Sequence, residues 1–202
     1  MTPSHVTDDS LRTKLIQTGL RLIATEGYNN LSLRKVAKLC EVSHNAPYKH
    51  FANKEELVQA IMQESAKEFQ AALAPILTHY HDAPKEQIIE LGVAYVTFMV
   101  ANPDYLQFSF MNQSPIPICI ESGMFHPCSN PSFNAFRSTA LRYLETVGAD
   151  LALYDTYVLS MWSLVHGLAS LFASGSITSV EPAEVVARHT ITTSLNTMFD
   201  SN

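Results

Sequence analysis

Residues 43–54 concentrate side chains whose chemistry suits contact with a nucleic acid. The amide of Asn45 can pair with two groups on the edge of adenine, and the imidazole of His44 can donate to guanine acceptors. Tyr48 and Lys49 suit a phosphate or the wall of a groove. His44 also reads as a solvent-facing turn residue, and Tyr48 as a residue packed on the preceding helix. The candidate contact residues are Ser32, Arg34, Ser43, His44, Asn45, Tyr48, Lys49, His50 and Lys54.

Short helices must hold these side chains in place. Ser32 is suited to cap a helix whose apolar residues, within 33–37, share one face. The pattern breaks at residues 40–43, and Ser43 can cap a second short helix that ends at Phe51. We assign the apolar side chains to a small core: Leu33, Val36, Ala37, Val42 and Phe51.

A longer helix follows at once. Asn53 can cap it, and Glu56 stands three residues later, which is the spacing of a capping box. Lys54 and His50 suit the phosphate backbone, while Ser32 and Arg34 can reach phosphates on the other side of a groove. Two short helices joined by a turn, with a polar and basic open face, have the geometry that enters a DNA major groove.

Charge is divided unevenly along the chain. The 202 residues carry a net charge of -6. Residues 10–54 contain eight Lys and Arg against two acidic residues, whereas residues 55–202 contain five against fifteen. This pattern is typical of a DNA-contacting module attached to a domain that does not touch DNA.

The remaining periodicity favours helices throughout, and no segment alternates convincingly as a strand. We predict an all-α chain of about nine helices, with a disordered tail at residues 1–9, a helix-turn-helix domain at 10–53, and a second domain at 54–202. Residues 54–78 form a connecting helix in which Pro75 should cause a kink or an end. The expected helices are 10–26, 32–39, 43–51, 54–78, 84–101, 105–111, 131–147, 150–174 and 182–199.

Residues 42–57 resemble the signature of the TetR family of bacterial transcriptional regulators. The similarity rests on Tyr48, His50 and Phe51 at the end of the second short helix, and on Lys54 through Leu57 at the start of the long one. It covers residues 10–60. A weaker similarity, to a TetR subgroup with a Trp…His-Gly element, rests on residues 162–167 and on 102–105.

Membership of this family implies a cytoplasmic homodimer whose two heads bind a palindromic operator in double-stranded DNA. It implies dimerisation through helices at about 150–174 and 182–199, and release of DNA by a small-molecule effector. Repression is the expected mode, with activation as the alternative. No cofactor and no membrane partner are expected.

Aromatic and methionine side chains are frequent in residues 98–172, where they indicate either ordinary core or a largely apolar pocket for an apolar or aromatic effector. The polar anchors considered include Asn112 and Gln113. The candidate pocket residues are Phe98, Tyr105, Phe108, Met111, Phe136, Tyr143, Trp162 and His166.

Other chemistry has weaker support. Cys119, His126 and Cys128 offer three donors in no standard zinc spacing, so a metal- or redox-responsive regulator is the alternative function. His79 and His81 read as a solvated turn.

Three irregularly spaced cysteines without a leader indicate a reduced, intracellular protein. The sequence contains no glycine-rich phosphate-binding loop, no nucleophile elbow and no catalytic pair of His and acid at helical spacing, so we do not expect an enzyme. The most apolar stretch, residues 151–173, reads as a buried bundle helix.

Overall fold

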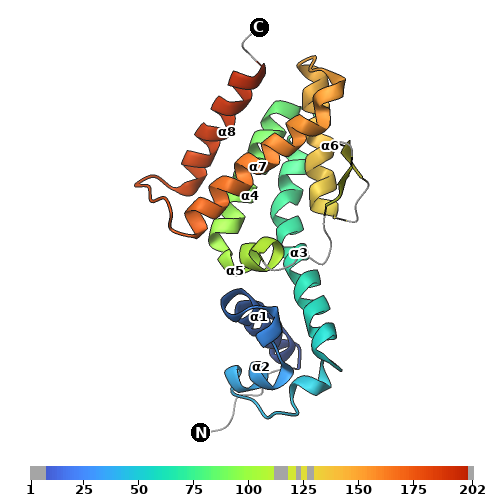
Figure 1. The fold of residues 1–202 in the computed structure, drawn as a ribbon, viewed down its shortest axis with the longest axis vertical. Helices are drawn as coiled ribbons and strands as arrows, with labels where there is room; N and C mark the ends of the chain where they lie inside the picture. Colours follow the sequence, from blue (N-terminus) through green and yellow to red (C-terminus); the bar gives the residue numbers. More distant parts are fainter. Residues whose placement is uncertain (1–7, 112–117, 122–123, 127–129, 200–202) are drawn as a thin grey trace. The chain divides into compact units, whose positions relative to one another are not determined.

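A computed structural model describes residues 8–111, 118–121, 124–126 and 130–199. Across these residues the prediction of an all-α chain is confirmed, with eight α-helices (Figure 1). A hairpin of two-residue strands, β1 (Ile120–Glu121) and β2 (Met124–Phe125), was not predicted, because strands this short leave no periodic signal. The described residues form one α-helix fewer than the nine that were predicted, because residues 43–51 do not form an α-helix.

The chain divides into two compact units, of which the first is Met1–Lys67 with Asp104–Ser114. It contains α1 (Asp8–Glu26), α2 (Leu33–Leu39), the first half of α3 (Lys54–His79), and most of α5 (Pro103–Leu106). α1 begins inside the predicted tail and ends immediately before Gly27, which has a left-handed φ of 84°. A glycine at this position can close a helix without steric cost.

The core of this unit extends beyond the predicted boundary at residues 53 and 54. Leu57, Ala60 and Ile61 of α3 are buried against α1 and α2 residues. Phe108, from the π-helical turn Gln107–Met111 that follows α5, is buried in the same core. The first turns of α3 therefore belong structurally to the head.

The second unit, Glu68–Pro103 with Pro115–Asn202, is built around α4 (Pro84–Ala101). This helix packs against α6 (Pro131–Thr146), α7 (Tyr154–Ala173) and α8 (Ala183–Phe199), as Figure 1 shows. The prediction that α4 lies deep in the core is confirmed, because its Ile88, Leu91 and Met99 are almost completely buried. The segment between α6 and α7 includes a short 3-10 turn, Leu151–Leu153.

A buried glutamine joins three helices of this unit. Gln87 is 1% exposed, and its Nε2 donates to the carbonyl oxygens of Leu77 at 3.0 Å and Ile76 at 3.4 Å, in the last turns of α3. Its Oε1 accepts from Thr139 at 3.2 Å and from Arg142, both on α6. α3 continues through Pro75 to His79. Gln87 adds donors in its last turns, where intrahelical donors run short, and the carbonyl of Ile76 also accepts from the N–H of Tyr80 at 3.1 Å.

α7 differs from its prediction as a buried bundle helix. One stripe of it is buried, formed by Val158, Met161, Val165 and Ala169. The span Leu151–Ala173 is long and apolar enough to cross a membrane, and only 22% of its apolar window is buried within the protein. An apolar core helix of a soluble protein passes the same length test, so this one helix is weak evidence for a membrane.

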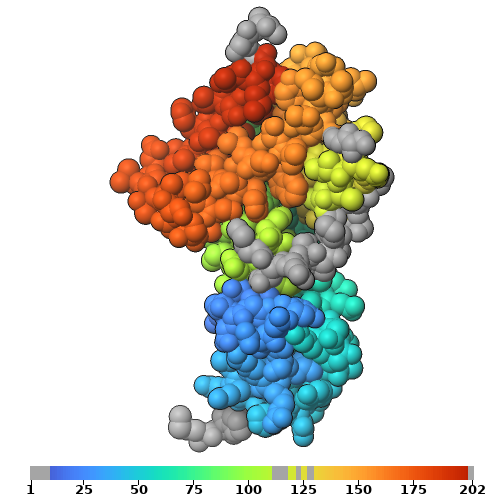
Figure 2. Space-filling model, in the orientation of Figure 1, coloured from blue at the N-terminus to red at the C-terminus, as the bar shows by residue number. Residues whose placement is uncertain are grey.

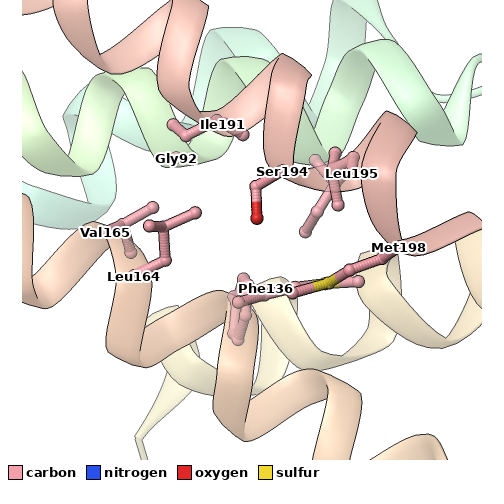
Figure 3. A pocket seen from close by; sticks show the side chains of 10 residues that line it. Gly92, Phe136, Leu164, Val165, Ile191, Ser194, Leu195 and Met198 are labelled. Carbon is pink, nitrogen blue, oxygen red and sulfur yellow. The ribbon is translucent and has the colours of Figure 1, made fainter.

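Gly92 allows α4 to approach α7 and α8 closely beside a small apolar cavity of about 20 Å³ (Figure 3). A Cβ at position 92 would lie 2.8 Å from Cδ1 of Ile191 and 3.1 Å from Cγ1 of Val165. The hydroxyl of Ser194 points into this cavity among apolar side chains.

We expect Gly92→Ala to lower the free energy of unfolding by about 1–3 kcal/mol, because the added methyl group overpacks the contact with Ile191. Adding Ile191→Val removes the clashing Cδ1, so the double variant should be more stable than Gly92→Ala alone. Gly167→Ala on α7 is the matched control, since a Cβ there meets no heavy atom within 4 Å. Urea denaturation measures all three, and equal destabilisation at positions 92 and 167 would contradict the close approach.

Candidate nucleic-acid interface and ligand site

The helix before the recognition segment is capped as predicted. The backbone N–H of Lys35 donates to Oγ of Ser32 at 3.2 Å, and Ser32 has the extended backbone of an N-cap. The hydroxyl accepts this bond with a lone pair, which leaves its own O–H able to donate to a phosphate. Arg34, the second residue of α2, is exposed. Both residues can therefore contact a DNA backbone.

The turn after α2 depends on a left-handed residue that is not glycine. Glu41 has a φ of 58°. The N–H of Val42 donates to the carbonyl of Ala37 at 3.0 Å, and that of Glu41 to the carbonyl of Lys38 at 3.1 Å. These two bonds form a Schellman motif, in which the left-handed position is usually glycine. The motif closes α2 and directs the chain into the recognition segment.

The recognition segment is not the continuous helix that was predicted for residues 43–51. It consists of turns and a single 3-10 turn, Pro47–Lys49. Pro47 has no N–H, so the Ser43 carbonyl lacks the donor that an α-helix would supply, and it accepts from Ala46 at 3.0 Å instead. The tight turns continue to Phe51, whose ring is buried.

These turns expose most of the predicted contact side chains on the first unit. Ser43, His44, Asn45, Tyr48 and Lys49 are exposed. His50 is half-buried. Pro47 is buried, so it supports the surface from below. The structure therefore presents the amide and imidazole that suit base edges, together with a phenol and an ammonium that suit phosphate.

Lys54 is held by a neighbour that sequence reasoning did not identify. Its Nζ donates to the carbonyl oxygen of Tyr28 at 2.7 Å and lies 3.8 Å from the centre of the Tyr28 ring. A phosphate contact by Lys54 would compete with both interactions. An exposed aromatic residue 26 positions earlier carries no periodic signal, and for this reason the pair was missed.

The cap at the start of α3 is close to its prediction. The N–H of Glu56 donates to Oδ1 of Asn53 at 2.8 Å, as expected for a capping residue. The Glu56 carboxylate accepts from the N–H of Ala52 at 2.6 Å, one residue before the usual partner in a capping box. These bonds fix the direction of the chain between the recognition segment and α3.

Known proteins share both halves of this arrangement. Residues 15–61 match the family of bacterial regulatory proteins of the tetR type, and residues 88–194 match the Tetracyclin repressor-like C-terminal domain. The chain belongs to the TetR family. It is a helix-turn-helix transcriptional regulator with a C-terminal domain of the ligand-binding type. The subgroup suggested by Trp162 and Gly167 stays a prediction.

Individual relatives are distant. The uncharacterized regulator YuxN of Bacillus subtilis is 40% identical over 48 residues, which are 24% of this chain and 16% of YuxN. The regulator UidR of Escherichia coli K12 is 29% identical over 82 residues, 40% of this chain and 42% of UidR. The TetR-family regulator PfmR of Thermus thermophilus shares the fold, with a TM-score of 0.66, 19% identity, and coverage of 89% of this chain and 92% of PfmR.

In the C-terminal unit, aromatic side chains from several elements form one connected row. Phe98 contacts Phe69 of α3, with ring centres 5.1 Å apart, and Phe69 contacts Tyr95 at 5.7 Å. The Tyr95 hydroxyl shares a 2.8 Å hydrogen bond with Nδ1 of His166. The row continues through Trp162 to Phe133 on α6. We call these six residues the aromatic row.

The row carries one polar point within apolar surroundings. Burial lowers the pKa of His166, which favours the neutral imidazole. Tyr95 is only 8% exposed and was missed, because on an apolar helix it reads as core. Tyr95, Phe69 and Phe133 join the predicted residues Phe98, Trp162 and His166, so six positions from α3, α4, α6 and α7 are brought together.

The other predicted pocket residues do not join this row. Tyr105 and Phe108 belong to the first unit, where burial raises the pKa of Tyr105 against a hydrogen bond from Ser109 that lowers it. Phe108 is buried in the core of the head, and its assignment to an effector pocket stays a prediction. Tyr143 packs against Phe199 of α8 at 5.6 Å.

Phe136 contacts Phe133 at 6.1 Å and lines the small cavity beside Gly92. The side chain of Met111 is not described, and Asn112 and Gln113 lie outside the described residues.

The residues of the alternative sensor are only partly described. Cys119 is exposed, and Cys128 lies outside the described residues. His126 forms an exposed pair with Glu121 at 2.9 Å. Among the described residues no group of three or more His, Cys, Asp or Glu side chains could hold a metal ion, His79 and His81 included.

We expect Glu41→Gly to stabilise the protein by about 1 kcal/mol, because glycine adopts the left-handed conformation of this turn without steric cost. Glu41→Ala removes the same carboxylate but keeps a Cβ, so it should not show this gain. Thermal and urea denaturation of both variants measure the difference. Equal stability of the Gly and Ala variants would show that the backbone at position 41 is not strained.

Proposed function

We propose that the chain is a transcriptional repressor that binds a palindromic operator as a homodimer and is released by a small, largely apolar effector. The observation that carries this proposal is the exposed set His44, Asn45, Tyr48 and Lys49 on a compact head. The head is also where basic residues outnumber acidic ones. The mode of action in this proposal is inferred from the family, and the DNA contacts are inferred from the exposed side chains.

In the proposed complex, the recognition segment enters the major groove of each half-site. His44 and Asn45 contact base edges, while Tyr48, Lys49 and Ser43 contact phosphates or the groove wall. Ser32 and Arg34 contact the backbone on the opposite side of the groove. His50 and Lys54 add phosphate contacts, for which Lys54 must leave Tyr28.

The proposed dimer forms through α7 and α8. α7 is the most apolar long helix, yet most of its surface is open within one chain. Leu159 and Leu171 of α7, and Val185 and Met198 of α8, are exposed. Figure 2 shows the two helices as adjoining surface on one face of the second unit. Water-exposed apolar surface of this extent is typical of an interface with another protein, here a second copy.

The proposed effector contacts the aromatic row. Its apolar part would replace contacts among Phe69, Phe98, Trp162 and Phe133, and its polar group would meet the Tyr95–His166 pair. Phe69 lies on α3, whose first turns are built into the head, so displacement of this ring acts on the helix that both units share.

Asn45→Ala should weaken binding to the operator by about tenfold or more, since a good base contact contributes about 1–3 kcal/mol of discrimination. Binding to unrelated DNA should change little. Lys49→Ala should weaken binding to both DNAs and reduce the salt slope by about one.

These affinities are measured by fluorescence anisotropy on DNA upstream of the coding sequence, over a series of salt concentrations. Lys67→Ala, on an exposed lysine of α3, is the control. Equal weakening on both DNAs by Asn45→Ala would contradict base contact.

Leu171→Glu should shift the protein from dimer to monomer, because a carboxylate would be buried in the apolar interface. Val180→Glu is the control, since Val180 is fully exposed in the loop before α8. Sedimentation velocity at several protein concentrations measures the change. A dimer that withstands Leu171→Glu, or dissociates equally with Val180→Glu, would exclude this face.

A further inference from the structure

An open pocket of about 560 Å³, lined mainly by α6, is separate from the apolar cavity beside Gly92. Its walls include Phe125 of β2 with the adjoining His126, and Arg137, Ser138 and Arg142 of α6. All of these residues belong to the second unit. The volume is within the range of about 300–1,000 Å³ that is usual for small-molecule sites.

Arg137 is held in position at this cavity by a carboxylate behind it. Oδ1 of Asp155, in the first turn of α7, accepts from Nη2 of Arg137 at 2.8 Å, and Oδ2 accepts from the N–H of Phe125 at 3.0 Å. Arg137 Nε is buried and has no hydrogen-bond partner among the described residues. A guanidinium has five N–H donors, so Arg137 retains donors for an acceptor in the cavity.

Arg142 is the second cation of the cavity, and it also fastens the end of α3. Its Nη1 donates to the carbonyl of His81 at 2.6 Å, in the link between α3 and α4. Its Nη2 donates to Oε1 of Gln87, whose amide holds the last turns of α3. The same guanidinium thus contacts both the cavity and the anchor of α3.

Two guanidinium groups are the part of this lining that suits an organic anion. Arg137 and Arg142 face the pocket, with Glu145 also in the wall and Asp155 behind Arg137. Guanidinium groups bind carboxylates through paired hydrogen bonds. Phe125, Phe133 and Leu141 supply apolar wall for a short hydrocarbon part.

We propose that this cavity binds a small amphipathic carboxylate, held by Arg137 and Arg142, and that binding draws Arg142 away from His81 and Gln87. The carbonyl of His81 then loses this donor, and Oε1 of Gln87 keeps its bond from Thr139 but loses the one from Arg142. This loosens the side chain that holds the carbonyls of Leu77 and Ile76 at the end of α3, the helix that begins in the DNA-binding head. The site is separate from the Tyr95–His166 pair and adjoins the aromatic row only at Phe133. Its effect on DNA rests on the proposed function, whereas ligand binding does not.

Binding is tested by isothermal titration of the full chain with hexanoate and with hexanamide, which has the same length but no charge. Hexanoate should bind at least tenfold more tightly. Arg137→Gln should weaken hexanoate binding about tenfold or more, whereas Arg188→Gln, which breaks an ion pair with Glu90 elsewhere, should not.

Ser138→Leu provides a second variant that leaves the Arg137–Asp155 pair intact, because Ser138 lies at the wall and leucine would occupy part of the pocket next to Arg137. It should weaken hexanoate binding at least tenfold even if Arg137→Gln fails to fold. Equal binding of hexanoate and hexanamide, or unchanged binding by Ser138→Leu, would overturn the site.

The regulatory step is tested separately by anisotropy on operator DNA. Hexanoate should lower DNA affinity of the wild type about tenfold and leave Ser138→Leu unaffected. DNA affinity that is unchanged by saturating hexanoate would overturn the coupling through Arg142. A protein that binds hexanoate but no upstream DNA would instead overturn the proposed function and, with it, the regulatory step, while the carboxylate site would stand.

Discussion

The hydrogen bonds of Gln87 determine how the connecting helix ends. The last carbonyls of a helix run short of intrahelical donors, and in α3 the N–H of Tyr80 donates to the carbonyl of Ile76 at 3.1 Å. Gln87 supplies further donors from α4 to Leu77 and Ile76, and its oxygen is in turn satisfied by Thr139 and Arg142 of α6. Loss of the Gln87 amide would remove the acceptor of the buried Thr139 hydroxyl, so three helices meet at a single side chain.

This anchor matters because α3 contributes to two cores. Leu57 and Ile61 are buried in the head, while Phe69 and Leu73 are buried in the second unit. A helix that serves two cores cannot shift at one end without changing packing at the other. The charged partner of the anchor, Arg142, is half-buried and also lines the pocket beside α6.

Local rules predicted much of the head from the sequence. Ser32, Asn53 and Gly27 act through bonds within a few residues, and all three occupy the helix ends expected of them. Pro47 shows where pattern failed: the apolar spacing fitted a helix, but the missing N–H converted it into tight turns. The burial of Phe108 in the core of the head was not predicted, because periodicity indicates that a residue is buried without indicating which core it joins.

The aromatic row shows the same limit of sequence-based prediction. Trp162 and His166 were singled out because they are unusual on an apolar helix, whereas Tyr95 and Phe69 could not be told from core residues. Their relation depends on packing between α3, α4 and α7, which spacing along one helix does not encode. Hydropathy likewise identified α7 as apolar, but it does not distinguish burial within one chain from burial against another.

Charge placement explains how an acidic protein can carry a DNA-binding head. Charges are screened beyond about 8 Å at physiological salt, so a phosphate responds to nearby residues more than to the net charge of -6.

Within the head, Lys35 is already paired with Glu26, and Lys14 donates to the carbonyl of Cys40. Arg34 and Lys49 are exposed beside the recognition turns, so the local field there depends on few cations. Glu41, exposed in the same turn, opposes them. A surface with so few cations favours modest affinity for arbitrary DNA, so in the proposed complex base contacts, for which His44 and Asn45 are the candidates, would decide where the protein binds.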